Sequence, residues 1–264
     1  MQAKLQRRIQ RYGWDKAAQF YEKYWQQQLA PSQTLLLQMA DLQAGERVLD
    51  LACGTGLVSF PAAKKVGQHG EVIGTDLSEN MVQTARCLAA DRGLTNTRFL
   101  RMDAEEIRFE NDAFDAVLCA LGMMYFPDPL KALQEMLRVL QPGGRAVAAV
   151  WGERQRCGWA EIFPIVDARV NTDVCPLFFQ LGTGEALAMQ FRNAGFERIE
   201  SRRISTILRY PTAEDACAAT FEGGPVALAH AGFDEQTRQQ AYAEYIDSIA
   251  PYRNGAGYEI PGEF

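Results

Sequence analysis

The chain has 264 residues, of which 47% are hydrophobic and 23% are charged, as in an ordinary globular protein with one large domain or a core and a smaller addition. Its formal net charge of −6 argues against a nucleic-acid partner, because binding to phosphates needs a basic surface. No apolar run approaches the roughly 20 residues that span a bilayer, so we expect no integral association with a membrane.

The first segment of the chain predicts a helical cap. The stretch "WDKAAQFYEKYWQQQLA" carries aromatic residues at helical spacing, which indicates an apolar stripe that packs on the main domain. Pro31 and Ser32 predict a break, after which a second helix runs to about Gly45. We therefore expect residues 1–45 to form an N-terminal helical cap.

Strands and helices then alternate over residues 46–151. Five short apolar segments predict strands: "RVLDLA", "EVIGTDL", "TRFLRMD", "FDAVLCAL" and "RAVAAVW". The segments between them predict helices, and Ser78 is in place to cap the helix that begins at Glu79. This alternation predicts a parallel sheet with helices on both faces, which forms the ligand-binding core.

Residues 152–264 are less regular. Helical segments lie beside two stretches with a β pattern, "ERIESRRISTILRY" and "GYEIPGEF". We expect the helices to form a lid over the ligand site and the final strands to complete the same sheet.

The cysteines and histidines form no metal-binding pattern. No CxxC pair is present, and His69 and His230 are far apart in the sequence. We expect no metal, and we expect the six thiols to be reduced in a cytoplasmic protein.

Acidic side chains follow three of the first four predicted strands. In an open parallel sheet the ligand lies at the carboxyl ends of the strands, beside the first strand. Asp50, Asp76 and Asp103 lie at such ends, and the segment from Cys119 to Gly122 follows the fourth strand. The sequence therefore predicts a crevice lined by carboxylates.

These acids favour a ligand without phosphate. Asp50 would repel a pyrophosphate held in the turn, and the Gly-x-Gly turn from Gly54 lacks the third glycine of a dinucleotide site. Asp50 fits an ammonium group, Asp76 the two ribose hydroxyls, and Asp103 the amino group of a purine. S-adenosylmethionine has these parts and carries no phosphate.

Five motifs, in order and at the right spacing, carry a resemblance to a known family. They are "VLDLACGTG", "VIGTDLSENMV", "RMDAEEI", "FDAVLCALGMMYF" and "RVLQPGGRAV". The sequence resembles the class I S-adenosylmethionine-dependent methyltransferases of the UbiE-like, or type 11, group. The resemblance implies a Rossmann-like, doubly wound α/β fold with a mostly parallel seven-stranded sheet of order 3-2-1-4-5-7-6, the last strand antiparallel.

The expected cofactor site combines Asp50 with residues that the resemblance implies. It would bind S-adenosylmethionine and its product S-adenosylhomocysteine through the cap and the four strand ends. The expected residues are Tyr21, Asp50, Ala52, Cys53, Gly54, Gly56, Asp76, Leu77, Met81, Asp103, Ala104, Cys119, Ala120 and Leu121. Ala52 stands where the general motif of the family has a glycine, as is often so in the UbiE-like group.

The methyl acceptor is expected between the cap, the loop after the fourth strand and the lid. The candidate residues are Tyr12, Trp14, Met123, Met124, Tyr125, Phe126, Trp151, Trp159, Phe163 and His230. So many rings predict a small apolar or aromatic acceptor, although a lid packed on itself is an equal alternative. Transfer would be an in-line displacement that depends on proximity and orientation, and the sequence does not identify a catalytic residue.

Two other functions stay open at this point. One is a protein that binds S-adenosylmethionine without transferring its methyl group. The other, which Asp50 and the missing third glycine disfavour, is a nucleotide-dependent oxidoreductase. The oligomeric state, monomer or homodimer, is also open.

Overall fold

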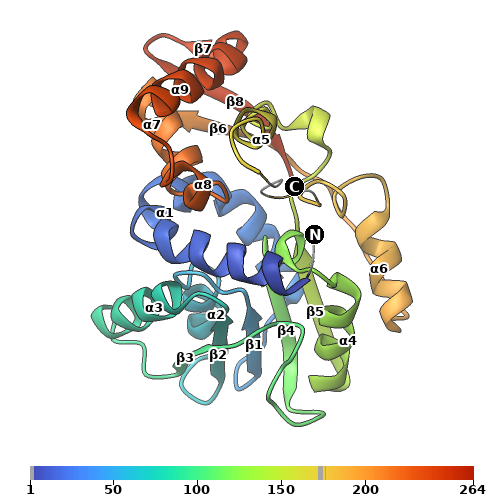
Figure 1. The fold of residues 1–264 in the computed structure, drawn as a ribbon. Helices are drawn as coiled ribbons and strands as arrows, with labels where there is room; N and C mark the ends of the chain where they lie inside the picture. The colour runs from blue at the N-terminus through green and yellow to red at the C-terminus, as the bar shows by residue number, and fades with distance from the viewer. Residues whose placement is uncertain (1–2, 172–174, 176) are drawn as a thin grey trace.

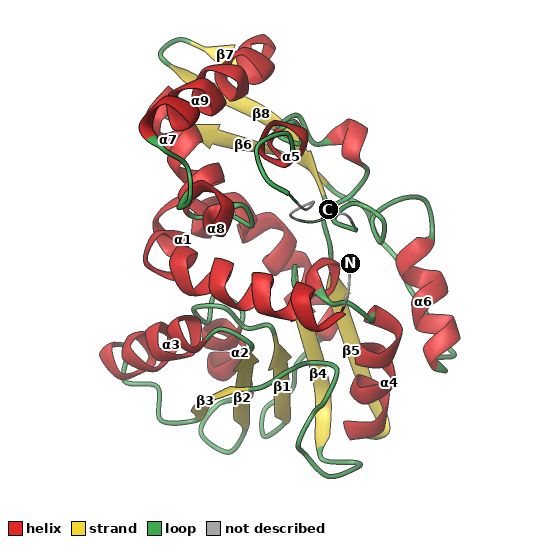
Figure 2. Cartoon of the chain, viewed as in Figure 1, coloured by secondary structure: helices red, strands yellow, loops and turns green. Residues whose placement is uncertain are grey.

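A parallel sheet of five strands forms the centre of the computed structural model, which describes residues 3–171, 175 and 177–264 (Figures 1 and 2). The strands are β1 (Arg47–Leu51), β2 (Glu71–Asp76), β3 (Thr97–Arg101), β4 (Phe114–Ala120) and β5 (Leu140–Ala149). They lie in the order β3-β2-β1-β4-β5, and α2 (Ser59–Val66), α3 (Glu79–Asp91) and α4 (Pro129–Val139) connect them. This confirms the Rossmann-like α/β class and the parallel sheet predicted for residues 46–151.

Both faces of this sheet are buried, as the nearly continuous apolar strands predict. Val48 and Leu118 face one side, where they pack in a cluster with Leu36 from the N-terminal helix and with the apolar residues of α2. Leu49 and Val117 face the other side and pack with the residues of α4. Alternate residues of one strand therefore pack into two different apolar clusters, one on each face, which is typical of a parallel sheet covered by helices.

The N-terminal helix is continuous. It is α1 (Ala3–Ala40), and it contains Pro31, so the predicted break there is wrong. Leu29 and Leu36, on either side of the proline, are both 2% exposed. Their burial stabilises the helix although Pro31 has no N–H to donate to the preceding turn. In Figure 1, α1 crosses the carboxyl ends of the strands, between the sheet and the C-terminal elements.

The final strands do not complete the parallel sheet. β6 (Ser205–Tyr210), β8 (Gly257–Glu263) and β7 (Arg253–Asn254) form a separate antiparallel sheet of order β6-β8-β7, so the predicted seven-stranded sheet is wrong. Every residue of β6 pairs with β8, from Ser205 opposite Glu263 to Tyr210 opposite Tyr258. Leu208 and Ile260 are fully buried in a cluster with Ala216 and Tyr245, so burial holds the pair to neighbouring helices rather than to β5.

Most of the other helices lie on the side of α1 that faces away from the parallel sheet, and one, α6, packs beside α4. They are α5 (Ile162–Asp167), α6 (Ala186–Ala194), α7 (Ala213–Cys217), α8 (Ala227–His230) and α9 (Glu235–Ile249). Short 3₁₀ helices cover Met123–Tyr125, Arg154–Arg156 and Ala250–Tyr252, and a π-helical turn covers Ala218–Glu222. The division into domains at residues 45 and 151 stays a prediction.

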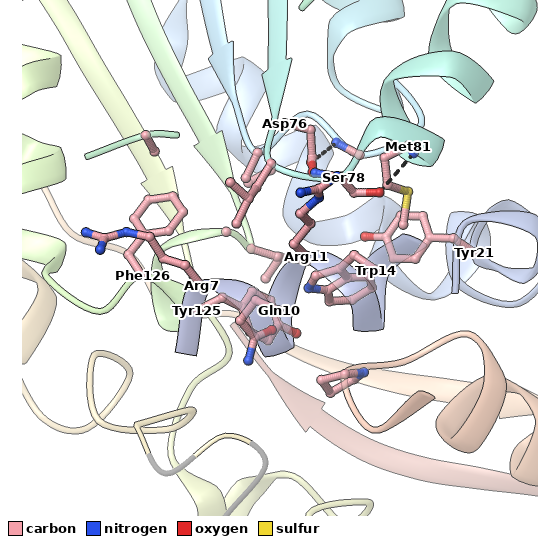
Figure 3. Close-up of a pocket in the computed structure, with 18 of the residues that line it drawn as sticks. Arg7, Gln10, Arg11, Trp14, Tyr21, Asp76, Ser78, Met81, Tyr125 and Phe126 are labelled. Atoms are coloured by element: carbon pink, nitrogen blue, oxygen red, sulfur yellow. Dashed lines mark hydrogen bonds between the residues drawn. The ribbon is translucent and has the colours of Figure 1, made fainter. Parts of the chain in front are cut away.

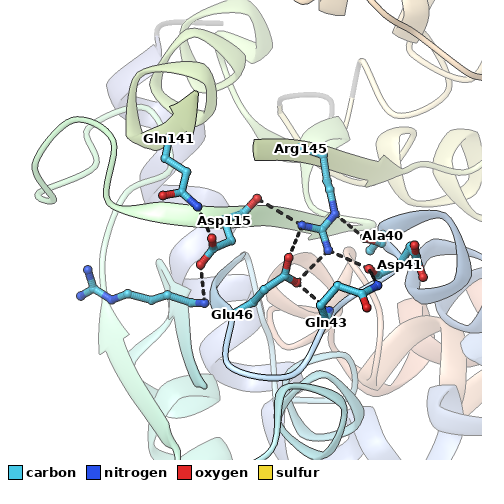
Figure 4. Close-up of polar contacts among 8 residues, drawn as sticks. Ala40, Asp41, Gln43, Glu46, Asp115, Gln141 and Arg145 are labelled. Atoms are coloured by element: carbon cyan, nitrogen blue, oxygen red, sulfur yellow. Dashed lines mark hydrogen bonds and ion pairs between the residues drawn. The ribbon is translucent and has the colours of Figure 1, made fainter. Parts of the chain in front are cut away.

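An arginine on β5 fastens the end of α1 to the sheet (Figure 4). Arg145 donates to both carboxylate oxygens of Glu46, at 2.7 and 2.8 Å. It also donates to the carbonyl oxygens of Ala40 at 2.5 Å and Asp41 at 2.9 Å, which end the helix. One planar guanidinium thus satisfies a carboxylate and two carbonyls that α1 leaves without helical partners.

Replacing Arg145 with alanine is expected to lower the free energy of unfolding by about 1–3 kcal/mol, because it leaves these acceptors without their charged donor. Arg145→Lys should recover only part of this loss, since an ammonium group cannot reproduce the fork. Urea unfolding measures both variants. Alanine at the exposed Arg198 is the control and should change the value by less than about 0.5 kcal/mol. A loss no larger than that for Arg145→Ala would contradict the assigned role.

Candidate functional site

A pocket lies where the strand ends meet α1 (Figure 3). It holds about 1000 Å³ of empty space, part of which is open to solvent. The strand ends contribute acids and turn residues, whereas α1 and the C-terminal segment contribute arginines and rings. The predicted cofactor residues that line the pocket are Tyr21, Ala52, Gly54, Asp76, Leu77, Met81, Asp103, Ala104, Ala120 and Leu121. Of the predicted acceptor residues, Trp14, Tyr125, Phe126, Trp151 and Trp159 line it too.

Nine other candidates of the predicted site do not line this pocket. They are Tyr12, Asp50, Cys53, Gly56, Cys119, Met123, Met124, Phe163 and His230. Met123 and Met124 are at most 2% exposed in the core, because the short helix after β4 turns them inward. The backbone amide of Cys53 donates to the carbonyl of Thr75 at 3.0 Å, which ties the turn after β1 to β2. Burial raises the pKa of the Cys53 thiol, which argues against a nucleophile.

Asp76 is the carboxylate that the glycine turn and the start of α3 hold in the pocket wall. Its Oδ2 accepts from the amide of Gly54 at 2.9 Å, and its Oδ1 accepts from the amide of Ser78 at 2.8 Å. Burial raises the pKa of Asp76 to about 6, and the two amides oppose this shift. Each oxygen keeps a further lone pair, so the carboxylate can still accept hydrogen bonds from a ligand.

The backbone around Asp76 is shaped for close approach. Gly54 has φ +55°, and a Cβ placed there would lie 3.6 Å from the ring of Tyr21. Ala52 and Leu121, which follow β1 and β4, have φ of 51° and 61°, a conformation that side chains disfavour. A Cβ on Gly122 would clash with the Cβ of Ala52, so the turns after β1 and β4 lie against each other. Main chain rather than side chains therefore forms this wall of the pocket.

Asp50 is buried behind that wall. It is 1% exposed, and its Oδ2 accepts from the hydroxyl of Ser59 at 2.6 Å. Its Oδ1 has no hydrogen-bond partner among the residues that the structure describes. Burial raises the pKa of Asp50 to about 7. A buried carboxylate oxygen without a donor fits the amino-acid end of S-adenosylmethionine, whose ammonium group supplies donors.

α1 closes the pocket through polar contacts at two places. Arg7 Nε lies 2.9 Å from Asp103 Oδ2, and the same guanidinium pairs with Glu105. Further along the helix, Asp15 accepts from the Ser78 hydroxyl at 2.6 Å and from the amide of Asn80 at 3.2 Å. The helix therefore bridges the segment after β3 and the start of α3.

Sequence reasoning missed the polar residues of α1 that line the pocket. Arg7, Gln10 and Arg11 lie on the same helical face as Trp14 and Tyr21, which were predicted. The i, i+4, i+7 spacing of Arg7, Arg11 and Trp14 was the available signal. It was missed because arginines near a chain terminus usually lie in solvent.

Aromatic rings form a continuous wall from the glycine turn into the C-terminal part of the pocket. Tyr21 contacts Trp14, Trp14 contacts Tyr125, Tyr125 contacts Phe178, and Phe178 contacts Trp159, with ring centroids 5.2–5.7 Å apart. All five line the pocket. This wall gives the pocket an apolar end, away from its acids, that suits a flat molecule.

His230 lies outside the pocket, on α8, which packs against α1. It is 8% exposed, lines a separate hollow with Lys16 and Glu222, and its Nε2 lies 3.0 Å from the hydroxyl of Tyr242. Burial lowers the pKa of His230 to about 4. The expected place of His230 in the acceptor pocket is therefore corrected: this histidine is packed between helices.

The described residues contain neither a cluster of metal ligands nor a membrane-spanning helix. In the part of the chain that the structure describes, no three His, Cys, Asp or Glu side chains group as metal ligands would. Within the same ranges, no helix is both long enough and apolar enough to cross a membrane.

Comparisons with known proteins bear on the same region. A family model described as a methyltransferase domain matches residues 42–158. The chain is 31% identical over 176 residues to a demethylmenaquinone methyltransferase of Oceanobacillus iheyensis, which covers 61% of this chain and 74% of that relative. It is 37% identical over 131 residues to the aklanonic acid methyltransferase DauC of Streptomyces sp. (strain C5), covering 50% of this chain and 60% of that relative.

A solved structure agrees in fold. A putative methyltransferase from Bacillus halodurans superposes with a TM-score of 0.60 over 88% of this chain and 94% of that one, at 23% identity. The relative from Oceanobacillus iheyensis, which is 31% identical and of which the chain covers 74%, defines the class as methyltransferase, and the solved structure agrees with it in fold. Within that class, the chain belongs to the S-adenosylmethionine-dependent methyltransferases of the UbiE-like group. This assignment removes the ground for the oxidoreductase alternative.

Proposed function

We propose that the protein transfers a methyl group from S-adenosylmethionine to a small apolar or aromatic molecule. The observation that carries the proposal is the carboxylate of Asp76, which the amides of Gly54 and Ser78 hold in the wall of a ring-lined pocket. Such a carboxylate can accept both hydroxyls of a ribose. S-adenosylmethionine, when bound, would supply a methyl group on a sulfonium, which is already a good leaving group.

The residues of the pocket support this binding mode. Leu77 and Met81 offer an apolar surface to an adenine beside Asp103 and Ala104. Asp50, behind the glycine turn, has an oxygen without a donor among the described residues and would act on the amino-acid end through the turn. Tyr21, next to Gly54, closes this end of the pocket.

The chain would contribute alignment and exclusion of water. α1 covers the pocket, and its contacts to Asp103 and Ser78 keep it in place. Burial raises the pKa of Tyr125 well above its usual range, so this phenol stays protonated and acts as a donor rather than a base. We nominate no general base.

The relatives support a quinone-type acceptor, since their names specify demethylmenaquinone and aklanonic acid as substrates. We also propose a cytoplasmic location, which is supported by six free cysteines, five of them buried.

Two measurements test the proposal. Calorimetry with S-adenosylhomocysteine should give binding, and incubation with methyl-labelled S-adenosylmethionine and a cell extract should give a labelled small molecule. Binding without any labelled product would instead favour a protein that binds the cofactor and transfers nothing. If S-adenosylhomocysteine does not bind, both forms of the proposal are wrong.

A further inference from the structure

The indole N–H of Trp159, in the lining of the pocket, has no hydrogen-bond acceptor among the described residues. Trp159 is 2% exposed. An indole N–H can only donate. Trp25 lines the same pocket, but its Nε1 donates to the carbonyl of Ala219 at 3.0 Å. The fold thus satisfies one of two neighbouring indoles and leaves the other unpaired.

The aromatic neighbours of Trp159 among the described residues carry no oxygen. Its ring contacts are to Trp25, Trp151, Phe163, Phe178 and Phe179, with centroids 4.7–6.3 Å apart. A buried polar group without a partner is rare in folded proteins, and the few polar groups in the lining of an apolar pocket orient its ligand. The missing acceptor atom would therefore come from the pocket.

Trp159 also lies at the apolar end of the pocket. Four successive ring contacts separate it from Tyr21, which sits against the glycine turn. A group bound by Asp76 and the turn would occupy the other end. The molecule that reaches Trp159 is therefore the methyl acceptor.

We propose that the indole N–H of Trp159 donates a hydrogen bond to an oxygen of the methyl acceptor. The acceptor is then a flat, largely apolar compound that carries a carbonyl, ether or phenolic oxygen on the part that enters deepest. This inference rests on the proposed function, because it takes the ligand at this end to be the acceptor. It makes Trp159 a residue that sets specificity, since a compound without the oxygen would leave the N–H unpaired.

The test measures the binding of two compounds of nearly the same shape to two variants, each of which replaces one tryptophan with phenylalanine. 2-Acetylnaphthalene carries a ketone oxygen, and 2-isopropenylnaphthalene has a CH₂ group in its place. Affinities of both are measured by calorimetry for the wild type, Trp159→Phe and Trp25→Phe, each with S-adenosylhomocysteine added. For each protein we take the ratio of the affinity for the ketone to the affinity for the alkene, and we compare this ratio between proteins. The two compounds differ in hydrophobicity, but that difference is the same in every protein and so cancels in the comparison.

Trp159→Phe should lower the preference for the ketone by about tenfold, the usual value of one hydrogen bond. Trp25→Phe should lower the melting temperature, because Ala219 loses its donor, and should keep the wild-type ratio even if both affinities fall. An unchanged ratio in Trp159→Phe, or no binding of the ketone to the wild type, would overturn the inference. A Trp159-dependent ratio in a protein that never transfers a methyl group would overturn only the proposed function.

Discussion

Replacing Asp76 with alanine is expected to weaken the binding of S-adenosylhomocysteine by about 2–4 kcal/mol, or roughly 30- to 1000-fold. The loss follows from two hydrogen bonds between the ribose hydroxyls and a carboxylate that is already oriented by the amides of Gly54 and Ser78. Calorimetry at pH 8 measures it, because the carboxylate is then ionised above its pKa of about 6.

The variant also removes the acceptor for those two amides, so the turn itself could be disturbed. Asp76→Asn keeps the shape of the side chain and separates the two effects: its melting temperature should stay closer to that of the wild type while binding remains weak. Asp91→Asn, at the exposed end of α3, is the control and should bind as the wild type does. Wild-type affinity in both Asp76 variants would refute the role of this carboxylate.

The place of Asp76 could be predicted because it depends on local sequence alone. A strand of alternate-face apolar residues ends at Asp76, Ser78 caps the next helix by accepting from the amide of Met81 at 3.1 Å, and a parallel sheet brings such ends together. The same reasoning located Asp50 and Asp103. The alternation of apolar residues in a strand and the capping of a helix depend on a few neighbouring residues. They can therefore be predicted without knowledge of contacts between distant segments.

The parts that failed depend on contacts between distant segments. The β pattern of "ERIESRRISTILRY" predicts a strand over residues 197–210, and only Ser205–Tyr210 forms one. The pattern does not state its partner, and β6 pairs with β8 instead of extending the parallel sheet. Pro31 was read as a break because its local cost is real, whereas the burial of Leu29 and Leu36 outweighs that cost. Arg7 carries no local sign of its partner Asp103, which is 96 positions away.

The affinity for S-adenosylhomocysteine is expected to rise by roughly 100-fold or more between pH 5 and pH 8. Asp50 and Asp76 have pKa values of about 7 and about 6, because burial disfavours their charged forms. Both are therefore protonated at pH 5 and ionised at pH 8. Only the ionised forms attract an ammonium group or accept charge-assisted hydrogen bonds from ribose, so binding must release protons at the lower pH.

The stability of the unliganded protein should fall as the pH rises, whereas its affinity for S-adenosylhomocysteine should increase. A carboxyl whose pKa is raised in the folded state binds its proton more tightly there than in the unfolded chain, where its pKa is about 3.9. Through Asp50 and Asp76, the stability of the unliganded protein is then greatest below pH 4 and is lost as pH rises through 6 and 7. The cofactor should offset this loss, so the rise in melting temperature on adding S-adenosylhomocysteine should grow with pH.

Calorimetry in two buffers of different ionisation enthalpy gives both the affinity and the number of protons released. Asp50→Asn should remove the part of the pH dependence near pH 7, and Asp76→Asn the part near pH 6. If the affinity is flat from pH 5 to pH 8 in the wild type, neither carboxyl changes charge on binding. Their burial would then be structural, and the amino-acid end of the cofactor would have to be held by other groups of the pocket.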